Sequence, residues 1–190
     1  MKRNLLIIIL SLSYLFNEEV ISLGNNKTDL TLINQANHIK GSMQLKEVVY
    51  QSINYKNTNF TTINIPGYHS SHDIGLPKLP QINELIEIPQ DAIPRIEIIS
   101  QEVSYYKLDE LNINDPIFPH QPSLSKSQTI DDLRLHWDQK YYNNNAYNDK
   151  EIITVDIKGT LRSINIGNIN INPINYNPSE KILKVSTNIE

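Results

Sequence analysis

Ile153-Thr154-Val155-Asp156-Ile157-Lys158 alternates apolar and polar side chains without a break. A β-strand turns successive side chains to opposite faces, so this alternation predicts a strand with one buried face and one solvent-facing face. Residues 183–189 repeat the alternation near the end of the sequence. The polar turn at 176–181 before them is short, and short connections favour antiparallel pairing.

Further strand-like runs come before these two segments. They lie at 45–50, 60–65, 82–88, 95–98 and 103–108. Pro66-Gly67 ends the second run and Pro89 ends the third, as turn residues do. Many short strands separated by turns predict an all-β fold, either an antiparallel β-sandwich or a barrel-like sandwich.

The segment 164–171 changes its alternation midway. Ile164 and Ile166 share one parity, whereas Ile169 and Ile171 share the other. Gly167-Asn168 lies between the two pairs. A β-bulge at this point would re-phase the pairing, because one extra residue shifts every later side chain to the other face.

The middle of the chain has a different character. Residues 115–122 are dense in proline and cannot form a central strand, so we expect an extended connector from Pro116 to about Gln128. Leu133 and Trp137 are spaced by four, which predicts a short helical segment near 131–140. An Asn/Tyr-rich loop is expected at 141–150.

The N-terminus has the pattern of a secretory signal peptide. Lys2 and Arg3 precede an apolar run that continues to Phe16. We assign 1–24 to a signal peptide, 25–44 to a polar leader without regular structure and 45–190 to the β-sandwich domain. The run is too short for a stable membrane span, so the protein is expected to be exported, either secreted or held in the cell envelope. The last alternation reaches Glu190 with no turn after it, which leads us to expect a longer precursor.

Composition excludes several function classes. The 190 residues carry a net charge of −4, so a broad basic surface for nucleic acid is not expected. No cysteine is present, which excludes disulfides, thiolate metal sites and a cysteine nucleophile within this chain. No phosphate-binding glycine loop or nucleophile elbow is found. We therefore expect neither an enzyme active site nor a cofactor in these residues.

A few side chains could still carry chemistry. Two histidines and a carboxylate at His69, His72 and Asp73 could bind zinc, and this leaves a metal-dependent hydrolase as one alternative. Exposed tyrosines could form a carbohydrate platform, and this leaves a secreted binding or adhesion module as another. Packing on strand faces is the simpler interpretation of these tyrosines, which are Tyr105, Tyr106, Tyr141 and Tyr142. The carboxylates Glu84, Glu87 and Glu97 fit the solvent-facing side of a sheet better than a catalytic pair. Arg162 is more simply a residue of a rim ion pair or an anchor for backbone carbonyls.

Gly75-Leu76-Pro77-Lys78-Leu79-Pro80 is a stiff extended segment that leads into a strand. Each of its two prolines fixes φ, removes a hydrogen-bond donor and pushes the preceding residue toward extended geometry. Such a segment is suited to positioning other parts of the chain rather than to catalysis.

These residues together resemble the N-terminal propeptide of the gingipain family of secreted bacterial cysteine peptidases. The match begins with the segment at Gly75, Pro77 and Pro80 and the two strand-like runs after it. It continues through Pro116-Ile117-Phe118-Pro119 and Ser125-Lys126. It ends with the strand that starts at Gly159-Thr160-Leu161-Arg162, then Asn172-Pro173 and Tyr176, and the closing strand.

The resemblance implies a propeptide that assists the folding of its own downstream peptidase domain and keeps it latent until proteolysis. It places the catalytic cysteine beyond Glu190 and implies onward export across an outer membrane. It also implies that a loop before the Gly-Thr strand presents a basic residue to the peptidase's specificity pocket. Lys150, and after it Lys140, are the candidates for that residue. The chain departs from the family pattern at Leu161, where methionine is usual, and at Ser163, where glycine is common.

Overall fold

The computed structural model describes residues 18–23, 28–35, 38–129, 133–148 and 150–190. Strands dominate these ranges, with a single turn of 3₁₀-helix and a single short α-helix. In chain order the elements are β1 Glu19–Ser22, β2 Asp29–Gln35, β3 His38–Gln44, β4 Glu47–Tyr55, β5 Thr58–Asn64, β6 His69–Ser70, β7 Pro80–Ile88, β8 Gln101–Lys107, η1 Leu108–Leu111, α1 Gln139–Tyr142, β9 Ile153–Leu161, β10 Ile164–Ile171, β11 Ile174–Asn177 and β12 Ile182–Ile189. No helix in the described ranges is long and apolar enough to cross a membrane.

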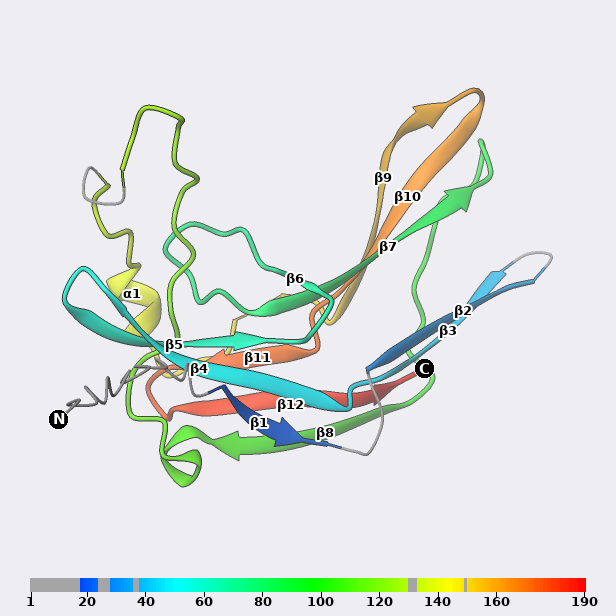
Figure 1. Cartoon of the computed structure of the whole chain (residues 1–190). Helices are drawn as coiled ribbons and strands as arrows, with labels where there is room; N and C mark the ends of the chain where they lie inside the picture. The colour runs from blue at the N-terminus through cyan, green and yellow to red at the C-terminus, as the bar shows by residue number, and fades with distance from the viewer. Residues whose placement is uncertain (1–17, 24–27, 36–37, 130–132, 149) are drawn as a thin grey trace, which may run out of the picture.

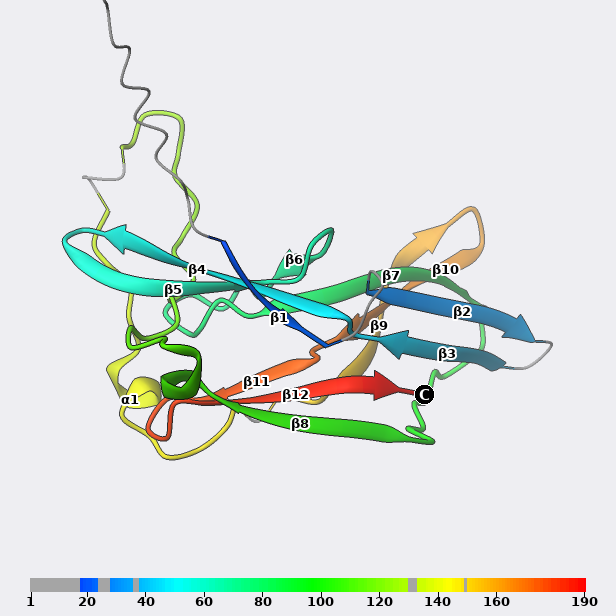
Figure 2. The ribbon, with the colours of Figure 1, turned by 60° about the horizontal axis from the view of Figure 1, so that its bottom comes forward.

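The strands form three antiparallel sheets (Figure 1). One has the order β1-β4-β5, and a second has the order β6-β7-β10-β9. The third has the order β11-β12-β3-β2, with β8 on the other edge of β12. Strands β7, β9 and β10 extend away from the body of the molecule as a long arm, and the β2–β3 hairpin forms a second projection (Figures 1 and 2). The all-β antiparallel sandwich is therefore confirmed; the described strands do not close into a barrel.

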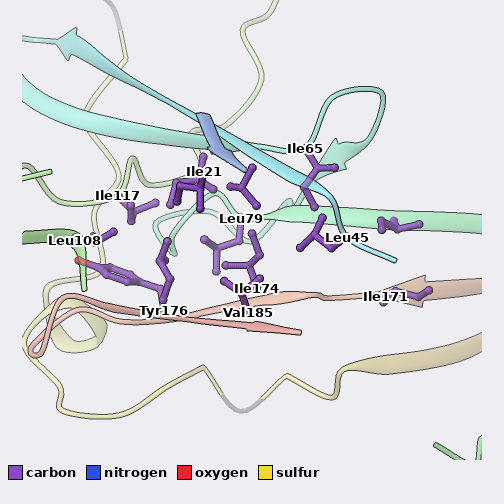
Figure 3. Packing of buried hydrophobic residues seen from close by; sticks show 14 of the residues in the cluster. Ile21, Leu45, Ile65, Leu79, Leu108, Ile117, Ile171, Ile174, Tyr176 and Val185 are labelled. Carbon is purple, nitrogen blue, oxygen red and sulfur yellow. The ribbon is translucent and has the colours of Figure 1, made fainter. Parts of the chain in front are cut away.

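The core lies between β1, β4 and β5 on one side and β11 and β12 on the other (Figures 2 and 3). Figure 3 shows Ile21, Ile65 and Leu79 facing Ile174 and Val185 across this interior. The alternation of β12 explains its role, since Leu183, Val185 and Ile189 are all buried. Fully burying one such side chain stabilises the fold by about 1.5–3 kcal/mol, so this layer contact contributes to stability.

The β9–β10 pairing contains the expected irregularity. Ile166 pairs with Gly159 and Gly167 pairs with Ile157, so the ladder shifts between Ile166 and Gly167. The extra residue is Lys158 on β9, whereas β10 itself pairs with β7 without a shift. A β-bulge at this site is thus confirmed, but it lies on the neighbouring strand.

Residues 25–44 do not form the polar leader that we expected. Within the described part of this range, β2 and β3 form a hairpin whose ladder runs from Asp29↔Gln44 to Gln35↔His38. Residues 25–44 are polar because the β2–β3 hairpin projects from the body and most of its side chains are exposed or half buried. Strand β1 also lies inside the range assigned to the signal peptide, where Ile21 is buried in the core. The basic and apolar start of the chain lies outside the described residues.

One other expectation is wrong, and a second, the short helix near 131–140, is displaced toward the C-terminus. Residues 95–98 form no strand; they are exposed and lie outside the ladders of the described residues. No helix spans 133–138, and α1 begins only at Gln139, after Asp138 caps it by accepting from the N–H groups of Lys140 and Tyr141. Leu133 and Trp137 therefore do not share a helical face.

Candidate functional site

A long loop, described for residues 119–129 and 133–137, projects from one end of the sandwich, above β4 and β5 (Figure 1). Its first limb is extended, as the prolines require. The segment before it joins β5, because Thr61 N–H donates to Pro116 (2.9 Å) and Phe118 N–H donates to Thr61 (2.8 Å). The loop therefore rises from a backbone that is already fixed to a core strand.

An aromatic cluster clamps both ends of the loop on the same residue. Phe60 of β5 is fully buried and packs edge-on against Phe118, which precedes the loop, with ring centroids 5.4 Å apart. It packs in the same way against Trp137, which follows the loop, at 5.2 Å. Edge-to-face aromatic pairs contribute about 0.5–1.5 kcal/mol each beyond area burial. The loop is thus pinned at its base by the side chain of Phe60.

A second closure lies farther out along the loop. The side chain of Gln121 donates to the carbonyl of His136 (2.8 Å) and accepts from the N–H of His136 (2.9 Å). The same amide nitrogen also donates to the carbonyl of Pro119 (2.9 Å). The Gln121 side chain therefore imitates a strand neighbour and holds the two limbs together. Lys56 adds a bond from its ammonium to the carbonyl of Leu133 on the returning limb.

The described tip of the loop is a tight turn at Ser125–Gln128. Gln128 N–H donates to Ser125 (3.1 Å), and the Ser125 hydroxyl donates to the Gln128 side chain (2.9 Å). Lys126 occupies the second position of this turn, and its side chain is exposed. The turn thus presents a lysine away from the body of the protein.

The Gly75–Pro80 segment lies beneath the first limb. Gly75 N–H donates to His120 (2.8 Å), and His120 N–H donates back to Leu76 (2.8 Å). The Gly75 carbonyl also accepts from Asp138 N–H on the returning limb (3.0 Å). Gly75 has φ +83°, and a Cβ there would lie 3.3 Å from the Asp138 nitrogen, so a side chain would disturb this contact. The segment positions the loop, in keeping with its stiffness.

Lys150 and Lys140, the two candidates for a pocket-binding residue that the resemblance implied, do not lie on the tip of this loop. The ammonium of Lys150 is paired with the carboxylate of Asp73. Lys140 is exposed on α1 beside the returning limb, with its N–H bound to the Asp138 cap. Lys150 would have to break its ion pair before it could enter a pocket on another protein.

The proposed zinc ligands do not converge. His72 packs edge-on against His120, with ring centroids 5.4 Å apart, and Asp73 is taken by Lys150. Within the described ranges no group of three histidine or acidic side chains could hold a metal ion. His120 lies close to His72 and Lys78, and burial together with these charges lowers its pKa below 6.5.

The tyrosines at 141 and 142 belong to the core rather than to a platform. Tyr142 donates to the carbonyl of Ile117 (2.6 Å), and Tyr141 donates to the carbonyl of Tyr176 (2.7 Å). Burial raises the pKa of both hydroxyls well above their ordinary value. Tyr105 on β8 is exposed, but Tyr141 and Tyr142 do not lie beside it on the surface. The tyrosines therefore do not form one binding surface. Glu84 and Glu87 are exposed on β7, and Glu97 lies in the unpaired segment.

The later motif residues are structural. Gly159 lies within β9, and the hairpin turn falls at Arg162 and Ser163, both with positive φ (49° and 71°). The left-handed backbone at Ser163 explains why glycine suits this position. The Pro173 carbonyl accepts from Ser186 N–H (2.8 Å), and Tyr176 is buried. The Gly159-Thr160-Leu161-Arg162 motif therefore ends β9 and enters the turn, whereas the resemblance implied that it starts a strand.

The projecting loop is the structural feature that the sequence analysis did not single out. Its signal was present, because a proline-dense limb and a lone tryptophan flank a short serine-rich segment with one lysine. In the sequence, Lys126 stands out only as part of the Ser125-Lys126 motif of the family resemblance.

Comparison with known proteins adds an independent line of evidence. The family described as Propeptide_C25 matches residues 23–190. Lys-gingipain HG66 of Porphyromonas gingivalis is 29% identical over 157 residues, which is 83% of this chain and 9% of that protein. Lys-gingipain of P. gingivalis strain ATCC 33277 is 28% identical over the same length. The chain therefore spans about a tenth of the length of these curated relatives.

Two solved structures are similar. One, described as structural insight into zymogenic latency of gingipain K from P. gingivalis, has a TM-score of 0.82 and 27% identity, covering 90% of this chain and 96% of that chain. The other, a complex of P. gingivalis RgpB pro- and mature domains, has a TM-score of 0.64 and 18% identity, covering 87% and 81%. The second likeness supports the fold alone.

Proposed function

Because this chain belongs to the Propeptide_C25 family, the propeptides of gingipain-type cysteine peptidases, we propose that it binds its own downstream peptidase domain and keeps it latent until proteolysis. The chain has no cysteine, so the thiol nucleophile belongs to that domain. The similar solved structure concerns zymogenic latency, which supports this role. No observation favours the adhesion module or the metal-dependent hydrolase.

The inhibitory element that we propose is the loop 119–137, with Lys126 as the side chain that enters the specificity pocket. The supporting observation is the presentation of Lys126 on a tight turn, above a base clamped by Phe60. Lys150, held by Asp73, and Lys140, on the flank of α1, are second candidates. The relatives named Lys-gingipains favour a pocket that accepts lysine.

The physical basis is that of a substrate mimic. Each rotamer-rich side chain that is immobilised on binding costs about 0.5–1.5 kcal/mol, and ordering a loop adds to this cost. A loop already fixed by Phe60 at its base and by Gln121 farther out avoids part of that cost. A lysine that enters an acidic pocket exchanges water for a buried ion pair. The turn also fixes the peptide bonds around Lys126, and a displacement of about 1 Å from the nucleophile lowers the cleavage rate strongly.

The test is titration of the separately produced peptidase domain with this chain, following hydrolysis of a small lysyl substrate. Lys126→Ala should weaken inhibition by roughly a hundredfold or more, because it leaves the acidic pocket unpaired. Lys150→Ala and Lys140→Ala are matched controls that should inhibit like the parent chain. If Lys150→Ala abolishes inhibition and Lys126→Ala does not, the loop assignment is wrong. If Lys126→Ala weakens inhibition as expected, Lys126→Arg reports whether the pocket prefers lysine.

Export is part of the same proposal. The basic and apolar N-terminal segment would direct the precursor through the inner membrane, and onward export across an outer membrane is an inference from the family. The signal peptide should end before Glu19, because β1 contributes Ile21 to the core.

A further inference from the structure

Residues 95–98 are an extended segment without a backbone partner in the described part of the chain. Their side chains alternate as Arg95, Ile96, Glu97 and Ile98, the pattern of a strand. Ile96 and Ile98 are nevertheless 42% and 40% exposed. A row of unpaired N–H and C=O groups with an apolar face is a template for another strand.

The last ladder of the chain leads directly into this segment. Strand β12 pairs with β8 up to Ile189↔Gln101. Glu190 continues the ladder, since its N–H donates to Ser100 (3.0 Å). Its carbonyl accepts from both Ile99 (2.7 Å) and Ser100 (3.3 Å), the pattern of a β-bulge at these two residues. Beyond the bulge the facing residues are Ile98, Glu97, Ile96 and Arg95 in turn.

We propose that the residues following Glu190 in the precursor extend β12 as a strand along 95–98. This inference rests on the proposed function, in which a peptidase domain follows the propeptide. In this register Glu97 is the residue whose N–H and C=O face the added strand, and the N–H of Ile98 points away. Strand β3 offers a second edge on the other side, because its described pairing with β12 covers only Gln44 and Met43.

The added strand has a defined route. The 89–100 segment runs from the C-terminus toward the end of β7 in both views, so the junction would run beside it toward the β7–β9–β10 arm (Figures 1 and 2). A peptidase requires an extended and unpaired substrate. Residues held in this ladder would be poor cleavage sites, and removal of the propeptide would begin beyond them.

Hydrogen–deuterium exchange of the full precursor tests the pairing. Amides in the 95–100 peptide should exchange roughly tenfold or more slowly in the precursor than in the chain that ends at Glu190. Equal exchange in the two proteins would overturn the proposal. Protection in the shorter chain that rises with protein concentration would also overturn it, since a second copy would then cover the edge.

Two proline variants of the precursor test the register. Glu97→Pro removes the N–H that faces the added strand and should restore rapid exchange in the segment. Ile98→Pro removes an N–H that points away and should leave more protection. Equal behaviour of the two variants counts against the pairing. Lys126→Ala separates the two proposals. If this variant leaves the peptidase latent while residues 95–98 stay protected, the assignment of the inhibitory loop is wrong and the strand pairing stands.

Discussion

Gln121 holds the main chain of His136 at both its N–H and its carbonyl, although the two residues are separated by the whole projecting loop. One side chain thereby replaces a pair of strand hydrogen bonds. Because the bonded atoms belong to the backbone of His136, the closure does not depend on the side chain at that position.

Opening this closure should weaken inhibition without unfolding the protein. Gln121→Ala removes the bonds to both limbs, and each exchanged bond contributes about 0.5–1.5 kcal/mol. We expect the inhibition constant to rise by roughly tenfold while the thermal midpoint changes little. Gln121→Glu keeps the acceptor for His136 N–H, so its inhibition constant should lie between those of the parent chain and Gln121→Ala. An unchanged inhibition constant for Gln121→Ala would show that the Gln121–His136 closure does not order the loop.

Gly167 should not tolerate a side chain. A Cβ at Gly167 would lie 2.4 Å from Cδ1 of Ile88 and 3.1 Å from Cγ1 of Ile86. Gly167→Ala is therefore expected to lower the free energy of unfolding by about 1–3 kcal/mol, measured by urea denaturation. Gly159→Ala is the matched control, because nothing lies within 4 Å of its Cβ position. Ile88→Val removes Cδ1 and should recover part of the loss in the double variant.

The pH dependence of stability should report His120. Its lowered pKa means that the folded protein binds a proton less readily than the unfolded chain. This contribution is present above pH 6.5 and is lost progressively as the pH falls from there through the lower folded pKa. His72, Lys78 and Asp73 are the charged neighbours, and Asp73 acts in the opposite direction. His120→Gln should flatten the fall in the free energy of unfolding between about pH 7 and 5, measured by urea denaturation.

The N-terminus of the exported protein should lie before Glu19. Removal of residues up to 24 would delete β1, the partner of β4 from Glu19↔Tyr50 to Ser22↔Glu47, and expose the site that Ile21 fills. N-terminal sequencing or intact mass of the exported precursor measures the boundary. A start beyond Ser22 would show that β1 is dispensable, and an Ile21→Ala variant without loss of stability would agree with that result.

Much of the fold could be predicted because alternation reports a half-buried strand. The runs at 45–50, 60–65, 82–88 and 103–108 all lie largely within strands. The change of alternation at Gly167 predicted a β-bulge, and the extra residue lies on β9, the strand paired with it. The β2–β3 hairpin was missed because its polar residues reflect half-exposed positions. Residues 95–98 show the opposite error, since a strand pattern alone does not supply a partner.

The site was less predictable than the fold for a physical reason. The clamp brings together Phe60, Phe118 and Trp137 from three distant segments, and no periodicity links them. Charge pairing was equally hidden. Nothing in the sequence signals that Asp73 holds the ammonium of Lys150, so a basic residue close to the Gly-Thr strand looked available.

Because Phe60 anchors both limbs of the projecting loop, the loop sequence can change while its base stays in place. Since the base is set by rings in the sandwich, the residues between Gln121 and His136 could be replaced or lengthened at little thermodynamic cost to the rest of the protein. A doubling of such a loop costs only about 0.6 kcal/mol in closure entropy. If this loop is the inhibitory element that we propose, a change of its sequence alone should direct the same scaffold to peptidases of other specificity.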